Sequence, residues 1–232
     1  MDQSTHLSRE TFVVYTATHV WENLPSVLLA GIVFSLFCAP TAVLCLLGLF
    51  VPALIVGVCS IGPAWAALLA REAVLTRGTR TSIGVMFVAL RHYWMRGLKL
   101  GALVAFPVLA GLLTLPSLGL PEVRPVVWVG LGADAIGFLL GIIILSMYAF
   151  PLLVLCDVSA RTALRNAIVL SARHVGDTLG LAGMGALIVL ATMYLSSGLT
   201  LILPAIWGVF AVNHCRVVLQ EDACLRDGCA SR

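Results

Sequence analysis

Charge is scarce in this chain of 232 residues, and the scarcity excludes an ordinary soluble domain. Only 11% of the residues are Asp, Glu, Lys or Arg, whereas 60% are hydrophobic. The mean hydropathy is correspondingly high, at +1.05. Soluble domains carry about 25% charged residues, because large contiguous apolar patches are avoided on a surface that faces water. The composition therefore predicts an integral membrane protein.

Signatures of catalysis, metal binding and nucleic-acid binding are also missing from the sequence. It contains no phosphate-binding loop, no Gly-x-Ser-x-Gly nucleophile motif and no His-Glu-x-x-His motif. The spacing of the seven cysteines matches no standard zinc site. A net charge of +3 is too low for the dense basic face of a nucleic-acid-binding protein. We expect no enzyme, no cofactor and no nucleic-acid partner.

Long uncharged segments predict where the chain crosses the membrane. Residues 24–70 contain no charged side chain, and as a helix they would be about 70 Å long, twice the hydrocarbon thickness of a bilayer. They predict one span at 24–45 and another at 50–70, with Pro40, Gly48 and Pro52 as possible breaks. Residues 100–121 predict a third span, and residues 125–156 predict a long fourth one.

Residues 178–215 form the last uncharged segment apart from His214. They fit two short spans that meet near residues 196–198, although a single span with a re-entrant segment remains an alternative. With six spans, thirteen of the fourteen basic residues fall on one side of the membrane and only Arg124 falls on the other. Because basic residues concentrate in cytoplasmic loops, this separation predicts six spans with both termini in the cytoplasm.

The expected organisation is a single domain of membrane helices, an all-α bundle. A cytoplasmic amino-terminal segment covers residues 1–22, the transmembrane domain covers residues 23–215, and a cytoplasmic tail covers residues 216–232. The first apolar segment begins only at Leu24 and is far longer than the apolar part of a signal peptide. We therefore expect it to be retained as a membrane span.

Two cytoplasmic connections have apolar residues at helical spacing. In residues 82–96 the apolar positions are Ile83, Phe87, Leu90 and Trp94, and in residues 160–175 the corresponding face comprises Ala160, Leu164, Ala167, Ile168, Ser171 and Val175. Both segments predict amphipathic helices at the membrane surface or beneath the bundle. The alternative is that each is a cytoplasmic extension of the neighbouring span.

Several stretches of the sequence together carry a resemblance to a known family. They are Asn23-Leu24 and residues 60–68 (SIGPAWAAL), 87–94 (FVALRHYW), 163–167 (ALRNA) and 171–174 (SARH). In this order the stretches resemble the YesL family, a domain of unknown function, over residues 20–215. The resemblance implies a bacterial inner-membrane protein in the context of carbohydrate-uptake transporters. The first apolar segment is longer than the family pattern.

Two candidate sites lie within the predicted spans. Gly62 and Pro63 lie in the second span, where a kinked helix can expose backbone carbonyls to a substrate; a packing kink among small residues is the alternative. Asp134 is the acidic residue within an apolar run, and such carboxylates are functional candidates. The run of residues 125–156 is longer than a span requires, so Asp134 at the solvated interface is the alternative.

Three candidates lie on the amphipathic segments, namely Arg91, Asn166 and Arg173. They can contact anionic lipid headgroups or dock a partner protein, although arginines on the cytoplasmic side need no further role. The function expected is that of a transport-associated component, either a small permease or an accessory of a carbohydrate uptake system. A non-transporting scaffold or regulatory subunit of a transporter or sensor kinase is the alternative.

Overall fold

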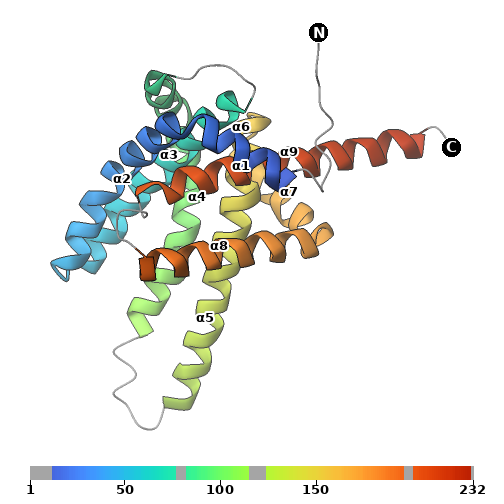
Figure 1. The fold of residues 1–232 in the computed structure, drawn as a ribbon. Coiled ribbons are helices and arrows are strands. Elements are labelled where there is room, and N and C mark those ends of the chain that lie inside the picture. Colours follow the sequence, from blue (N-terminus) through green and yellow to red (C-terminus); the bar gives the residue numbers. More distant parts are fainter. Residues whose placement is uncertain (1–11, 77–81, 115–123, 196–200, 231–232) are drawn as a thin grey trace.

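The computed structural model describes residues 12–76, 82–114, 124–195 and 201–230, and within them the regular structure is entirely helical (Figure 1). In chain order the helices are α1 (Phe12–Glu22), α2 (Leu24–Leu46), α3 (Phe50–Leu75), α4 (Ile83–Thr114), α5 (Arg124–Ile144), a π-helical turn (Leu145–Ala149), α6 (Phe150–Leu155), α7 (Ala160–Arg173), α8 (Val175–Leu195) and α9 (Leu203–Ala230).

Within the described residues, four helical segments are long and apolar enough to cross a membrane. They are Leu24–Leu46, Phe50–Leu75, Ile83–Thr114 and Val127–Leu155. These segments overlap the first four predicted spans, so the prediction of an all-helical protein with helices able to span a membrane is confirmed. Residues 115–121, which the sequence assigned to the third span, lie outside the described residues.

The break between the first two spans falls at Gly48. This residue has a φ of +74°, a left-handed conformation that glycine adopts without steric cost. Pro40 lies inside α2, and Pro52 lies in the first turn of α3, where a missing backbone N–H removes no helical hydrogen bond. Of the three breaks that the sequence suggested, only the glycine ends a helix.

The two amphipathic segments have different outcomes. Residues 83–96 are the first part of the continuous helix α4, which is the extension that the sequence left as an alternative. The second segment forms a separate helix, α7, whose first turn is capped by the Ser159 hydroxyl accepting the Thr162 backbone N–H at 3.3 Å. Its buried face contains Ala163, Ala167 and Leu170, whereas Ile168 is 51% exposed. The buried face is thus rotated from the predicted one.

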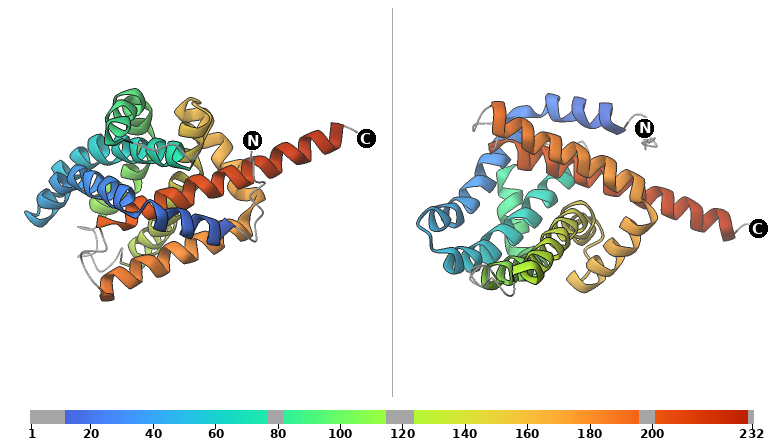
Figure 2. Two further views of the ribbon diagram at one scale, coloured as in Figure 1. Left: turned by 45° about the horizontal axis from the view of Figure 1, so that its top comes forward. Right: turned by 90° about the horizontal axis from the view of Figure 1, so that it is seen from below.

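The last two predicted spans correspond to α8 and α9, and their expected junction at residues 196–198 lies outside the described residues. In Figure 1 both helices run across the direction of α5, and the view from below in Figure 2 shows them lengthwise. Helix α9 continues past Cys215 into the predicted tail, and α1 packs against it. A six-span arrangement with cytoplasmic termini stays a prediction.

Helix α3 is the central element of the fold, because it packs against α2, α4, α6 and α9. Where α3 contacts α4, the backbones of the two helices touch each other. A Cβ atom added at Gly62 would lie 2.6 Å from the Gly97 carbonyl oxygen, and one added at Gly97 would lie 2.9 Å from the Pro63 Cα. Glycines permit this close approach of the two backbones, since any side chain would push the helices apart. We call the contact of Gly62, Gly97 and Gly101 the glycine crossing.

The glycine crossing predicts a steep sensitivity to one added methyl group. We expect Gly97→Ala to lower the free energy of unfolding by about 1–3 kcal/mol, because the backbones must separate to admit the Cβ atom. Chemical unfolding in detergent measures the effect. Gly141→Ala on α5 is the control, since a Cβ atom there meets nothing within 4 Å. Equal stability of the two variants would show that the crossing adapts without cost.

Candidate functional site

Gly62 and Pro63 are buried at the glycine crossing and belong to an uninterrupted helix. The proline leaves α3 continuous from Phe50 to Leu75, and Gly62 faces Gly97 across the contact with α4. This geometry supports the packing interpretation of the two residues. Gly62 also lines one end of an apolar cavity that is partly open to the protein surface.

The cavity has a volume of about 330 Å³ and lies between α2, α3, α4 and α5, with Phe150 of α6 also in its wall. Gly62 and Gly101 line it beside the glycine crossing. Nearly all the lining side chains are hydrocarbon. Thr41 and Trp65 also line it, and the Thr41 hydroxyl and the Trp65 indole N–H are buried without a hydrogen-bond partner among the described residues. Such a wall suits an apolar ligand.

A buried ion pair lies on the other side of the glycine crossing, in the last turns of α3. The Arg71 Nη1 atom is 2.5 Å from the Glu72 Oε1 atom, and both residues are 0% exposed. The Arg71 Nη2 group also donates to the Ser26 carbonyl at 2.8 Å and to the Ser26 hydroxyl. Because a buried charge is strongly disfavoured unless it is paired, this arrangement joins the start of α2 firmly to α3.

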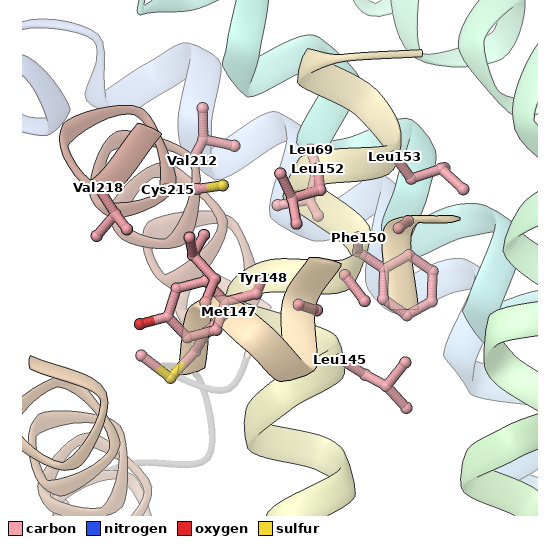
Figure 3. Packing of buried hydrophobic residues seen from close by; sticks show 14 of the residues in the cluster. Leu69, Leu145, Met147, Tyr148, Phe150, Leu152, Leu153, Val212, Cys215 and Val218 are labelled. Atoms are coloured by element: carbon pink, nitrogen blue, oxygen red, sulfur yellow. The ribbon is translucent and has the colours of Figure 1, made fainter. Parts of the chain in front are cut away.

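The π-helical turn places a second polar group in the core. The Tyr148 hydroxyl is 2.8 Å from the Thr178 hydroxyl and 3.0 Å from the His214 Nε2 atom. Figure 3 shows Tyr148 turned toward α9 while Phe150 points to the opposite side, where it lines the cavity. The π-helical turn, which contains one more residue than an α-helical turn, therefore directs Tyr148 and Phe150 into two different regions of the core.

Helix α9 contributes polar side chains in almost consecutive positions. The Asn213 side-chain amide donates to the Thr16 hydroxyl of α1 at 3.1 Å, and the Arg216 guanidinium donates to the Ala73 carbonyl of α3 at 2.7 Å. Together with His214, these residues attach α9 to three different parts of the protein. They act as structural hydrogen-bonding groups rather than as a shared pocket.

Asp134 lies on α5 against α4. Its Oδ2 atom is 3.2 Å from the position that a Cβ atom at Gly111 would occupy, and the residue is partly exposed. Gly111 is about 21 Å along α4 from Gly97. The carboxylate is therefore remote from the glycine crossing. It lies about two turns inside the candidate span Val127–Leu155, so its location at the interface stays a prediction.

The remaining candidates, Arg91, Asn166 and Arg173, are exposed. Arg91 lies on α4, and the other two lie on α7, which packs against α4. The structure thus separates the six predicted residues into a buried glycine–proline pair, a distant carboxylate and a polar surface. Among the described residues, no group of three or more His, Cys, Asp or Glu side chains is placed to hold a metal ion.

Asp157 forms an ionic contact on this surface that the sequence analysis missed. Its Oδ1 atom lies 2.5 Å from the Arg96 Nη1 atom and 3.4 Å from the His92 Nε2 atom. Asp157 has a φ of +47°, a conformation that Asp and Asn tolerate better than most residues. Hydrogen bonds from Arg96 first, and then from His92, lower the pKa of Asp157 below its ordinary value of 3.8. The contact fastens the α6–α7 connection to α4.

Sequence reasoning also missed Arg71, Glu72, Tyr148 and the polar residues of α9. Arg71 and Glu72 follow directly after the uncharged segment ending at residue 70, so the span predicted at 50–70 stops just before them. A usable signal was present, since two adjacent opposite charges sit among alanines and leucines. Tyr148 had no sequence signal, because its position depends on the π-helical turn.

Comparison of the chain with models of protein families, with curated proteins and with solved structures finds no match. The resemblance to the YesL family therefore stays a prediction.

The buried ion pair predicts a large effect when one partner is removed. We expect Arg71→Met to lower the free energy of unfolding by about 3–5 kcal/mol, because it leaves the Glu72 carboxylate buried and unpaired. The double variant Arg71→Met/Glu72→Leu should recover part of that loss, since no charge then remains buried. Chemical unfolding in detergent measures both.

Arg96→Met is the control for the buried pair, because it breaks an ionic contact at the protein surface. It should change the stability little. A loss in Arg71→Met no larger than that in Arg96→Met would contradict the role given to the buried pair.

The lowered pKa of Asp157 predicts a dependence on pH. A carboxylate whose pKa is lower in the folded state stabilises that state fully above its unfolded pKa, and the stabilisation disappears as the pH falls through the folded pKa. Wild-type protein should thus have a slightly higher Tm than Asp157→Asn at about pH 6, and the difference should shrink as the pH falls below 3.8. Asparagine tolerates the left-handed backbone, so the variant isolates the charge. A difference in Tm that persists unchanged in acid would contradict this assignment.

Proposed function

We propose that the protein is a multi-pass component of the bacterial cytoplasmic membrane that acts as an accessory subunit of a transport system rather than as the transport pathway. The resemblance to the YesL family supports the bacterial setting and the link to carbohydrate uptake. The apolar cavity is the observation that favours an accessory role over a permease.

The chemistry of the cavity is unsuited to a sugar. A carbohydrate presents several hydroxyl groups, and each one buried without a hydrogen bond costs about 1–3 kcal/mol. The cavity wall offers chiefly hydrocarbon surface, with Thr41 and Trp65 as isolated polar residues. A sugar bound there would lose most of its hydrogen bonds to water and regain few. A carbohydrate pathway through a partner protein is consistent with this wall.

The exposed faces of the candidate spans support contact with lipid and with other membrane proteins. On α4 the exposed large side chains include Leu103, Phe106 and Leu113, and on α5 they include Ile136 and Leu139. Arg91 on α4 and the exposed arginines of α7, which packs against α4, add a polar surface. We assign the docking of a partner subunit to this polar surface.

Reconstitution and co-purification test the proposal together. Purified protein in liposomes should take up no labelled carbohydrate on its own, whereas extraction in a mild detergent should recover a transporter subunit with it. Carbohydrate uptake by the protein alone would overturn the accessory role in favour of a permease. Recovery of a sensor kinase without a transporter would instead favour the regulatory scaffold.

A surface variant makes the co-purification specific. Arg91→Gln should reduce the recovered partner severalfold, because the charge lies on the proposed docking surface. Lys99→Gln is the matched control, since Lys99 is another exposed basic residue of α4 about two turns further along. Equal loss in both variants would point to a general effect of charge rather than to this surface.

A further inference from the structure

The apolar cavity has the dimensions of a slot between helices. Helix α3 lines it from Phe50 to Trp65, a length of about 22 Å, and α4 lines it from Gly101 to Leu112, about 16 Å. A volume of about 330 Å³ spread over these lengths gives a mean cross-section of roughly 15–20 Å². This is a long space, wide enough to admit one extended hydrocarbon chain.

The slot extends over a length similar to that of one leaflet of a bilayer. Its walls come mainly from α2, α3, α4 and α5, which supply the helical segments able to cross a membrane. One end lies at Cys45 and Phe50, beside the turn between α2 and α3, and the other lies at the glycine crossing near the middle of α3. The hydrocarbon of one leaflet is about 15 Å thick, so the slot has the length of one acyl chain.

The shape of the slot follows from the glycine crossing. The backbones of α3 and α4 touch at Gly62 and Gly97, whereas larger side chains separate the two helices toward Phe50 and Leu112. Phe138 of α5 and Phe150 of α6 line another side, and the slot is partly open to the protein surface. The space is therefore a consequence of how these helices diverge.

We propose that this slot binds one acyl chain of a phospholipid from the leaflet on the side of the α2–α3 turn. The lipid headgroup lies at that turn, and the chain end reaches the glycine crossing. The wall of the slot is almost entirely hydrocarbon, which matches the surface of an acyl chain. The inference does not depend on the proposed accessory role.

Filling the slot tests the proposal. Wild-type protein is reconstituted in vesicles of phosphatidylcholine, extracted in a mild detergent and weighed intact by native mass spectrometry. We expect one retained phospholipid per chain. In Ala105→Phe the new ring occupies the slot, because Ala105 lines it, and the retained lipid should fall at least fivefold.

Ala102→Phe is the matched control, since Ala102 lies on the exposed face of the same helix. It should retain the lipid as wild type does. Equal retention by the two variants, no retained lipid in wild type, or retention of free fatty acid or detergent alone would each overturn the proposal.

A second measurement avoids any change to the slot itself. Trp65 lines the slot near the glycine crossing, so a variant whose other four tryptophans are phenylalanine reports on this location. Phosphatidylcholine brominated near the ends of its acyl chains should quench the fluorescence of Trp65 strongly. Lipid brominated near the ester group should quench it less. Equal quenching by both lipids, or none, would contradict an inserted chain.

Discussion

The close approach of α3 and α4 at the glycine crossing is the contact on which the rest of the structure depends. Gly62 and Gly97 bring the two backbones together, and the character of the protein differs on either side of that point. Toward Phe50 and Leu112 the helices diverge around an apolar cavity. Toward Arg71 and Arg96 the side chains are charged and hydrogen-bonded. One backbone contact thus separates an apolar half from a polar half.

The polar half is held together by groups that cannot easily be exchanged. Arg71 and Glu72 neutralise each other in the core, and Ser26 gives Arg71 further acceptors. Because a lone charge at such a site is far less favourable than a pair, α2 and α3 must come together in this register. Tyr148 and His214 connect the π-helical turn to α9 in a similar way. These contacts give the bundle specificity that apolar packing alone supplies poorly.

The helices could be predicted from the sequence because charge gaps report directly on the cost of burying charge in hydrocarbon. That signal located α2, α3 and the helix through Val127–Leu155. It misplaced Arg71 and Glu72, since a charge gap cannot distinguish a loop from a buried ion pair. The buried face of α7 was also mispredicted. Ala163 and Leu170 are buried instead of Ile168, and which side of α7 is buried depends on where the neighbouring helices lie. The continuity of α4 was one of two alternatives that the apolar pattern left open.

The candidate spans also have large apolar side chains on their exposed surface. Helix α4 has Leu103 and Phe106 exposed near the glycine crossing, although the opposite face of the same turns lines the cavity. In water the exposed apolar side chains on the outer face of this helix would be unfavourable, whereas in a bilayer both of its faces contact hydrocarbon. The force that holds these helices together is then close packing rather than the hydrophobic effect. Small residues at the crossing provide that packing, and a narrow unfilled space beside it leaves room for lipid to complete the contact.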